Sequence, residues 1–321
     1  AIIRGENNLL AHAYFAIPIS ITVEGANILT RNLMQFGQGL IKSHPYIYTQ
    51  INALKNNNVQ SFDRAFFAHI GLVFNSFCKS LAYYLTRAQI NCQKGHFQRY
   101  KQKLTWVSSE FTLLTNVALA ILGPSLKKRE NISARFGDIL SNCYLITATL
   151  REFENNPNEQ DKDLVDYICN YCFNEIQIAR EEIISNIGFI GFLLPLVKIN
   201  PFSIKAKDKL NAKIIKNLND QNYLKSLTSS LFISSNEKDR LNVIQEAVKQ
   251  NKECEISFKK LKDTIKNETI KKDNFENMTN ELLEKNILSN EEIEKMKKAH
   301  ALKQEVISVD SFEANEYKEK R

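Results

Sequence analysis

Hydrophobic residues recur along most of the chain at intervals of three and four positions, which is the spacing of an amphipathic helix. Four long stretches of this kind, joined by short links, cover residues 61–87, 97–122, 126–154 and 163–185. Gly123 and Pro124 follow the second stretch, as glycine and proline commonly do where a helix ends. The pattern predicts an all-α fold whose main part is an antiparallel helical bundle.

Beyond Pro201 the pattern changes, because lysine and asparagine become more frequent, aromatic residues fewer and the predicted helices shorter. We expect a second, smaller helical lobe there. Ser289 and Glu292 have the spacing of a capping box at the start of its last helix. The expected domains are residues 1–45, 46–200, 201–302 (the small lobe) and 303–321 (a polar tail).

The first long stretch has an unusually aromatic face. Its aromatic residues are Phe62, Phe66, Phe67, Phe74, Phe77, Tyr83 and Tyr84. An apolar stripe of this kind normally packs into a protein core, so we expect these side chains to be buried.

Composition and charge are those of a globular protein with a mixed surface. Of the 321 residues, 43% are hydrophobic and 25% charged, and the net charge is +7. The lysines are interleaved with acidic residues, which is typical of a solvated helix face. No basic block interleaved with aromatic residues is present, so we expect no nucleic-acid partner.

Cysteines and histidines give no sign of a metal site. Cys169 and Cys172 have a CxxC spacing, but no second pair and no nearby histidine complete a zinc set. The six cysteines form no disulfide framework, and a reducing cytoplasm fits best. The five histidines lack ligand spacing. We therefore expect buried thiols and no metal.

The longest apolar run is Ile183 to Val197, which Asn186, Gly188 and Pro195 interrupt. It is too short and too broken for a regular membrane helix. Two interpretations stay open, a buried connector and a hydrophobic patch that dips into a membrane interface.

A different pattern precedes the first long stretch. The β-branched residues Ile17, Ile19, Ile21 and Val23 alternate along the chain and lead to Glu24. A helical pattern then starts and runs from 26 to 42. This order places the carboxylate at a turn that opens onto a helix.

Two interpretations of Glu24 follow. A carboxylate at a helix start is stabilised there by the helix dipole and needs no function. Burial among apolar neighbours, however, raises the affinity of a carboxylate for its proton, which a general base requires near neutral pH. Gly25 has no side chain and would leave room for a flat ligand near the backbone.

The segment VEGANILTR (residues 23–31), followed by FGQG and HPY, resembles the catalytic segment of the acyl-CoA dehydrogenases. It is most similar to the large bacterial fatty-acid β-oxidation type, which has a long helical C-terminal extension. The blocks LGPSLKKRENISARFGDILSNCYL (122–145) and ISVDSFE (307–313) resemble that extension.

The resemblance implies an FAD-dependent oxidation of fatty acyl-CoA to trans-2-enoyl-CoA, with an electron-transfer flavoprotein as acceptor. In the family a carboxylate takes the α-proton of the thioester while a hydride passes to the flavin. Glu24 would be the base, and Gly25, Asn27, Thr30 and Arg31 would lie near substrate or cofactor.

The sequence also departs from the family. Ala26 and Ile28 stand where many members have the threonine and glutamine that hold the cofactor, and Asn27 or Thr30 would have to substitute for them. No glycine-rich phosphate loop occurs in the chain. We therefore expect the flavin-binding domains upstream or on a separate chain, and a fragment that is inactive alone.

The alternative is a non-catalytic helical module for dimerisation or peripheral membrane association. The run Ile183 to Val197 and the basic residues Lys127, Lys128 and Arg129 would then contact a second copy or the inner membrane. The expected location is cytoplasmic, with peripheral contact at the inner membrane under this alternative.

Overall fold

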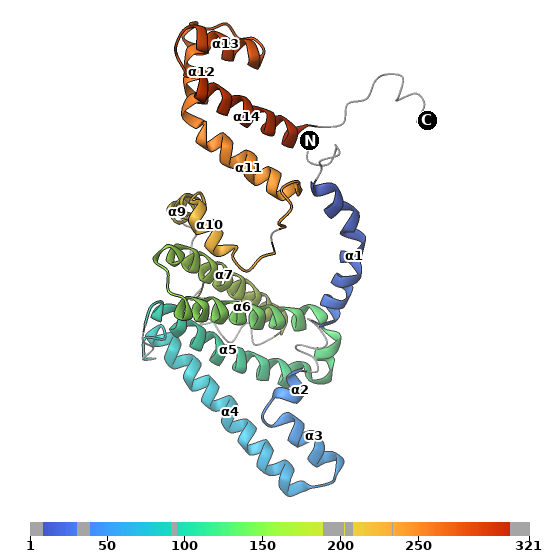
Figure 1. Ribbon diagram of the computed structural model, residues 1–321. Helices are drawn as coiled ribbons and strands as arrows, with labels where there is room; N and C mark the ends of the chain where they lie inside the picture. The colour runs from blue at the N-terminus through green and yellow to red at the C-terminus, as the bar shows by residue number, and fades with distance from the viewer. Residues whose placement is uncertain are drawn as a thin grey trace, which may run out of the picture. The chain divides into compact units, whose positions relative to one another are not determined.

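The structure is a computed structural model that describes residues 9–30, 39–90, 95–188, 202, 208–232 and 234–308. All regular elements in these ranges are helices, which confirms the predicted all-α class (Figure 1). The chain divides into two compact units. One unit is Val23–Ser229, and the other combines Ala1–Thr22 with Ser230–Arg321. The expected domain boundaries stay a prediction.

The unit Val23–Ser229 contains the long helices that the hydrophobic spacing predicts. Its helices are α2 (Gly39–Ser43), α3 (Ile47–Lys55), α4 (Val59–Thr86), α5 (Gln98–Leu122), α6 (Glu130–Asn155), α7 (Lys162–Asn186), α9 (Asp208–Leu218) and α10 (Gln221–Leu227). Short 3₁₀ helices, η2 (Gly123–Lys128) and η3 (Glu159–Asp161), join α5 to α6 and α6 to α7. Helices α5, α6 and α7 lie side by side in Figure 1, and α4 packs against α5.

The core of this unit lies between α5, α6 and α7. Phe136 and Phe173 are fully buried, and Trp106 is 3% exposed. The Trp106 ring meets Phe202 edge to face, with ring centroids 5.0 Å apart. Such aromatic pairs stabilise a core beyond the effect of their buried area.

The other unit has a separate core, to which α12 (Glu255–Lys266), α13 (Phe275–Glu284) and α14 (Asn290–Ile307) contribute, and α11 (Arg240–Glu253) packs against α14. The predicted capping box is confirmed: the Ser289 N–H donates to Glu292 Oε2 at 2.9 Å, and the Glu292 N–H donates to Ser289 Oγ at 3.3 Å. Helix α14 continues to Ile307. From residue 309 on, the expected tail lies outside the described residues.

The alternating segment before Glu24 is helical, which contradicts the predicted turn. Helix α1 spans Leu9–Leu29 and includes Pro18. An isolated extended segment leaves its backbone N–H and C=O groups unpaired, whereas a helix pairs them internally. The helix penalty of β-branched residues is only a few tenths of a kcal/mol each. The helix expected over 26–42 is seen to Leu29, and residues 31–38 lie outside the described part.

The aromatic face of α4 is largely exposed, so the prediction of a core was wrong for four phenylalanines. Phe67 and Phe74 are each 68% exposed, and Phe66 and Phe77 are also exposed. Tyr83 and Tyr84 do pack against the core, as predicted.

In the part of the chain that the structure describes, two helices are long and apolar enough to cross a membrane when judged by length and composition alone. They are Val59–Thr86, with 11% of its most apolar window buried, and Gln98–Leu126, with 39% buried. The core helix of a water-soluble protein meets the same criterion, so the finding does not assign a membrane span.

Candidate functional site

Glu24 lies in the last two turns of α1, and its side chain is exposed. Its neighbours Ile21 and Val23 are exposed as well, at 70% and 52%. The described residues therefore supply the apolar surroundings expected for a base but not the burial. Any desolvation of this carboxylate requires a partner that covers this end of α1.

The other predicted site residues are only partly described. Thr30 follows the end of α1 and is exposed. The surroundings of Gly25, the side chain of Asn27 and the whole of Arg31 lie outside what the structure describes. The structure therefore does not test whether these residues form one site with Glu24.

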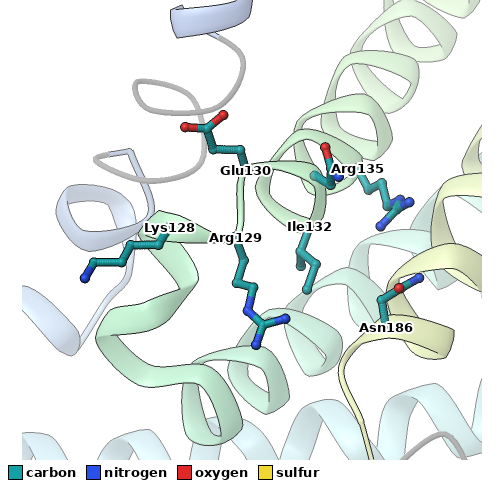
Figure 2. Close-up of a pocket in the computed structure, with 7 residues that line it drawn as sticks. Lys128, Arg129, Glu130, Ile132, Arg135 and Asn186 are labelled. Carbon is teal, nitrogen blue, oxygen red and sulfur yellow. The ribbon is translucent and has the colours of Figure 1, made fainter.

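Two of the cavities lined by described residues of the unit Val23–Ser229 are large enough to hold a small ligand, and neither has the character of a flavin site. One, of about 370 Å³, is shown in Figure 2. The other, of about 470 Å³, lies between α6 and α7. Their sizes suit a small ligand, but ligand pockets of this size are normally lined by apolar and aromatic side chains. These cavities are lined mainly by charged and polar residues. Neither of these two cavities fits FAD by itself.

The first cavity lies at the start of α6, where part of the predicted basic cluster is found. Figure 2 shows Lys128 and Arg129 pointing in different directions, with Glu130 beside them. Arg135 Nε donates to Glu182 Oε2 at 2.6 Å, so its charge is already compensated. The cations do not converge, as the capture of one anion would require. The side chain of Lys127 lies outside the described residues.

Two histidines meet at one asparagine, an arrangement that the sequence does not suggest. Asn116 Oδ1 on α5 lies 3.2 Å from His44 Nε2 and 2.6 Å from His69 Nε2. The backbone N–H groups of Tyr46 and Ile47 donate to His44 Nδ1, both at 3.2 Å. Nδ1 therefore carries no proton and Nε2 is the donor. Burial, and next the nearby His69, lower the pKa of His44.

This cluster of His44, His69 and Asn116 has a structural role. His44 precedes α3, while His69 belongs to α4 and Asn116 to α5. The Asn116 amide N–H also donates to the Thr112 carbonyl at 2.8 Å. Each ring nitrogen of His44 already has a partner, so no free acid or base is left on that ring. The arrangement ties three helices together.

A buried ion pair connects α5 to α7. Arg180 Nε donates to Glu110 Oε1 at 2.7 Å, and the two side chains are 5% and 11% exposed. Burial raises the pKa of Glu110, and Arg180 acts against this rise. A carboxyl group with a shifted pKa is a candidate for a functional site when it faces a cleft. Neither of these two cavities includes Glu110, and we interpret the pair as a structural link between α5 and α7.

The burial predicted for the two cysteines of the CxxC step is confirmed. Cys169 and Cys172 are free and buried on α7. Burial raises the pKa of Cys169 to about 12, so this thiol stays protonated and unreactive near neutral pH. Among the described residues, no group of three or more His, Cys, Asp or Glu side chains is placed to hold a metal ion.

Comparison with known proteins gives one family. The family described as acyl-CoA dehydrogenase, C-terminal, bacterial type, matches residues 41–312. No solved structure matches the fold. The matched range begins after Glu24, so it identifies the helical region without assigning the carboxylate. Since it covers most of the chain, this protein belongs to the bacterial-type C-terminal family of the acyl-CoA dehydrogenases.

Proposed function

We propose that this chain is the base-bearing part of an enzyme that oxidises fatty acyl-CoA in β-oxidation. In this proposal Glu24 removes the α-proton of the acyl thioester. Flavin chemistry belongs to the family, and FAD would be held mainly by domains outside this chain, with an electron-transfer flavoprotein as acceptor.

The proposal depends chiefly on the family match, together with the sequence VEGANILTR just before the matched range. The setting of Glu24 adds physical support. The carboxylate lies among exposed apolar residues, including Ile21, Val23 and Leu29. Exposed apolar surface of this kind commonly marks a contact or ligand surface. A covering domain would remove water from the carboxylate and raise its affinity for a proton.

A Glu24→Gln variant of the complete enzyme tests the assignment. Glutamine keeps the shape of the side chain but cannot accept the proton, so turnover should fall by about a hundredfold or more. The flavin absorbance should be unchanged, because the proposal gives Glu24 no part in holding FAD. Glu152→Gln, which changes an exposed glutamate on α6, is the matched control. Unchanged turnover in Glu24→Gln would remove the catalytic role.

A helical association module is the second candidate function, favoured by the exposed apolar face of α4. Such a face is suited to a second copy or to peripheral contact with a membrane. Co-sedimentation of the chain with anionic vesicles at low salt tests the membrane version, and no binding would count against it. This role and the catalytic role are compatible.

A further inference from the structure

The outer face of α4 is the largest exposed apolar feature of any single helix in the unit Val23–Ser229, as far as the structure describes it. Its exposed apolar side chains are Val59 (70%), Phe66 (43%), Phe67 (68%), Ile70 (49%), Phe74 (68%), Phe77 (45%) and Leu85 (72%). The opposite side of the helix carries the buried residues Ala65 and Ser76 and packs against α3 and α5.

The order of these residues indicates that the missing partner is a helix. Phe67, Ile70, Phe74, Phe77 and Leu81 follow one another at intervals of three, four, three and four. This is the spacing of a seam between two helices that wind around each other. A lipid surface would not require so narrow and regular a stripe, since it accepts any apolar face of sufficient width.

The stripe also matches the same stripe on a second copy of α4 that runs in the opposite direction. In an antiparallel pair centred on residue 72, Phe67 lies opposite Phe77 of the second helix, and Ile70 lies opposite Phe74. Phe67 and Phe77 therefore meet ring to ring, which is a favourable pairing, and Ile70 packs an aliphatic side chain against Phe74 of the second helix. Gly71 lies beside this centre, and an added Cβ would meet no atom within 4 Å there. The space at Gly71 lets a second helix approach closely.

The exposed area is sufficient for such a pair. A whole phenylalanine side chain has about 200 Å² to bury, so the four rings leave roughly 450 Å² exposed per copy. Two copies would bury roughly 900 Å² from the rings alone. Ile70, Leu85 and the flanking residues bring the total close to the roughly 1,200 Å² at which specific interfaces begin.

We infer that the outer face of α4 is a homodimer interface, in which two copies of this chain pack their α4 helices antiparallel about a twofold axis near Gly71. The same patch on both partners is what a twofold interface requires. This inference does not depend on the catalytic role of Glu24.

A double variant, Phe67→Asp with Phe74→Asp, tests the surface. The wild-type full chain should have the mass of a dimer in solution, and the variant about half that mass. Charges on the seam cost far more when buried than in water. Tyr144→Asp, at an aromatic residue of α6 that is 73% exposed, is the matched control and should remain dimeric. Far-UV circular dichroism and Trp106 fluorescence establish that each variant is folded.

Cross-linking tests the antiparallel arrangement, because Cys78 is an exposed residue of the same helix. Its expected counterpart on the second helix is Phe66, so Phe66→Cys with an oxidant should give a covalent dimer. The wild-type chain should give none through Cys78. The two Cys78 residues would be offset by about 18 Å along the helices, beyond the reach of a disulfide. A Cys92→Ser background removes the cysteine that lies outside the described residues.

Three results would overturn the inference. One is a wild-type monomer, and another is a dimer that the double variant leaves intact. The third is a Cys78–Cys78 cross-link, which would indicate a parallel pair. If the wild type is monomeric and binds anionic vesicles only while Phe67 and Phe74 are present, the face belongs to a membrane.

Discussion

Glu110 and Arg180 are charged groups that the fold removes almost completely from water. Burial of two charges costs free energy, which their attraction offsets only when geometry and additional hydrogen bonds are favourable. Here one oxygen of the carboxylate, Oε2, has no hydrogen-bond partner among the described residues. The pair therefore contributes little net stability, but removal of either partner alone leaves an uncompensated buried charge.

Arg180→Met should lower the free energy of unfolding by about 3–5 kcal/mol, because Glu110 stays buried without its cation. In the double variant Glu110→Leu with Arg180→Met, most of this loss should be recovered, since no charge is buried. Urea denaturation of the wild type, both single variants and the double variant gives the coupling free energy. A double variant as unstable as Arg180→Met would show that the pair is not the cause.

The loss of stability in Arg180→Met should depend on pH. Burial holds the pKa of Glu110 above its ordinary value of 4.5 in the folded protein. The folded state therefore binds this proton more tightly, and stability falls as the pH rises from 4.5 through the folded-state pKa. In Arg180→Met the opposing cation is gone and the pKa rises further. The free energy of unfolding that Arg180→Met loses relative to the wild type should be smaller at about pH 5 than at about pH 7.

Sequence reasoning was weakest for contacts between residues far apart. His44 and His69 meet at Asn116, from positions 72 and 47 residues away. Helical periodicity assigns each residue to a face of its own helix but does not say which faces meet. The buried ion pair was missed for the same reason. The predicted site residues near Glu24 stay a prediction, because their surroundings depend on residues that this structure does not describe.

Among the elements, those with local signals were predicted well. The predicted helix over 97–122 is observed as α5, which ends before Gly123, a residue with φ +48°. Glycine adopts this backbone conformation at little cost. The burial predicted for the aromatic face of α4 was wrong for a physical reason. An apolar stripe indicates that a surface contacts a partner, but it does not say whether that partner belongs to the same chain.

The capping box of α14 supports a prediction at this scale. Ser289→Ala removes the side-chain acceptor for the Glu292 N–H and should lower the free energy of unfolding by about 1 kcal/mol. Glu292→Ala removes the reciprocal bond to the Ser289 N–H. Since the two bonds close one motif, the double variant should lose less than the two single losses together. Thermal unfolding followed by circular dichroism measures all three, and strictly additive losses would contradict a reciprocal box.

Two separate cores shape the behaviour of the whole molecule. One core contains Trp106, Phe136 and Phe173 and belongs to the unit Val23–Ser229. The other contains Leu282 and Met296 and belongs to the unit with the C-terminal helices. Each hydrophobic cluster lies within its own unit. Domains with their own cores generally unfold as separate cooperative units.

Trp106 makes this testable, because it is the only tryptophan of the chain and lies in the first of these cores. Its fluorescence reports the unit Val23–Ser229, while circular dichroism reports both units. Phe173→Ala should destabilise the first unit by about 3–5 kcal/mol and shift the fluorescence transition in urea. Leu282→Ala should cost its own unit about 2–5 kcal/mol and shift only part of the dichroism transition.

The combination of the two probes separates independent units from coupled ones. If the units unfold independently, the fluorescence midpoint of Leu282→Ala equals that of the wild type, and its dichroism curve becomes biphasic. If the fluorescence midpoint moves together with the dichroism midpoint, the two cores support each other through contacts between the units. The first result is expected, because the side chains of each cluster are buried by neighbours within the same unit.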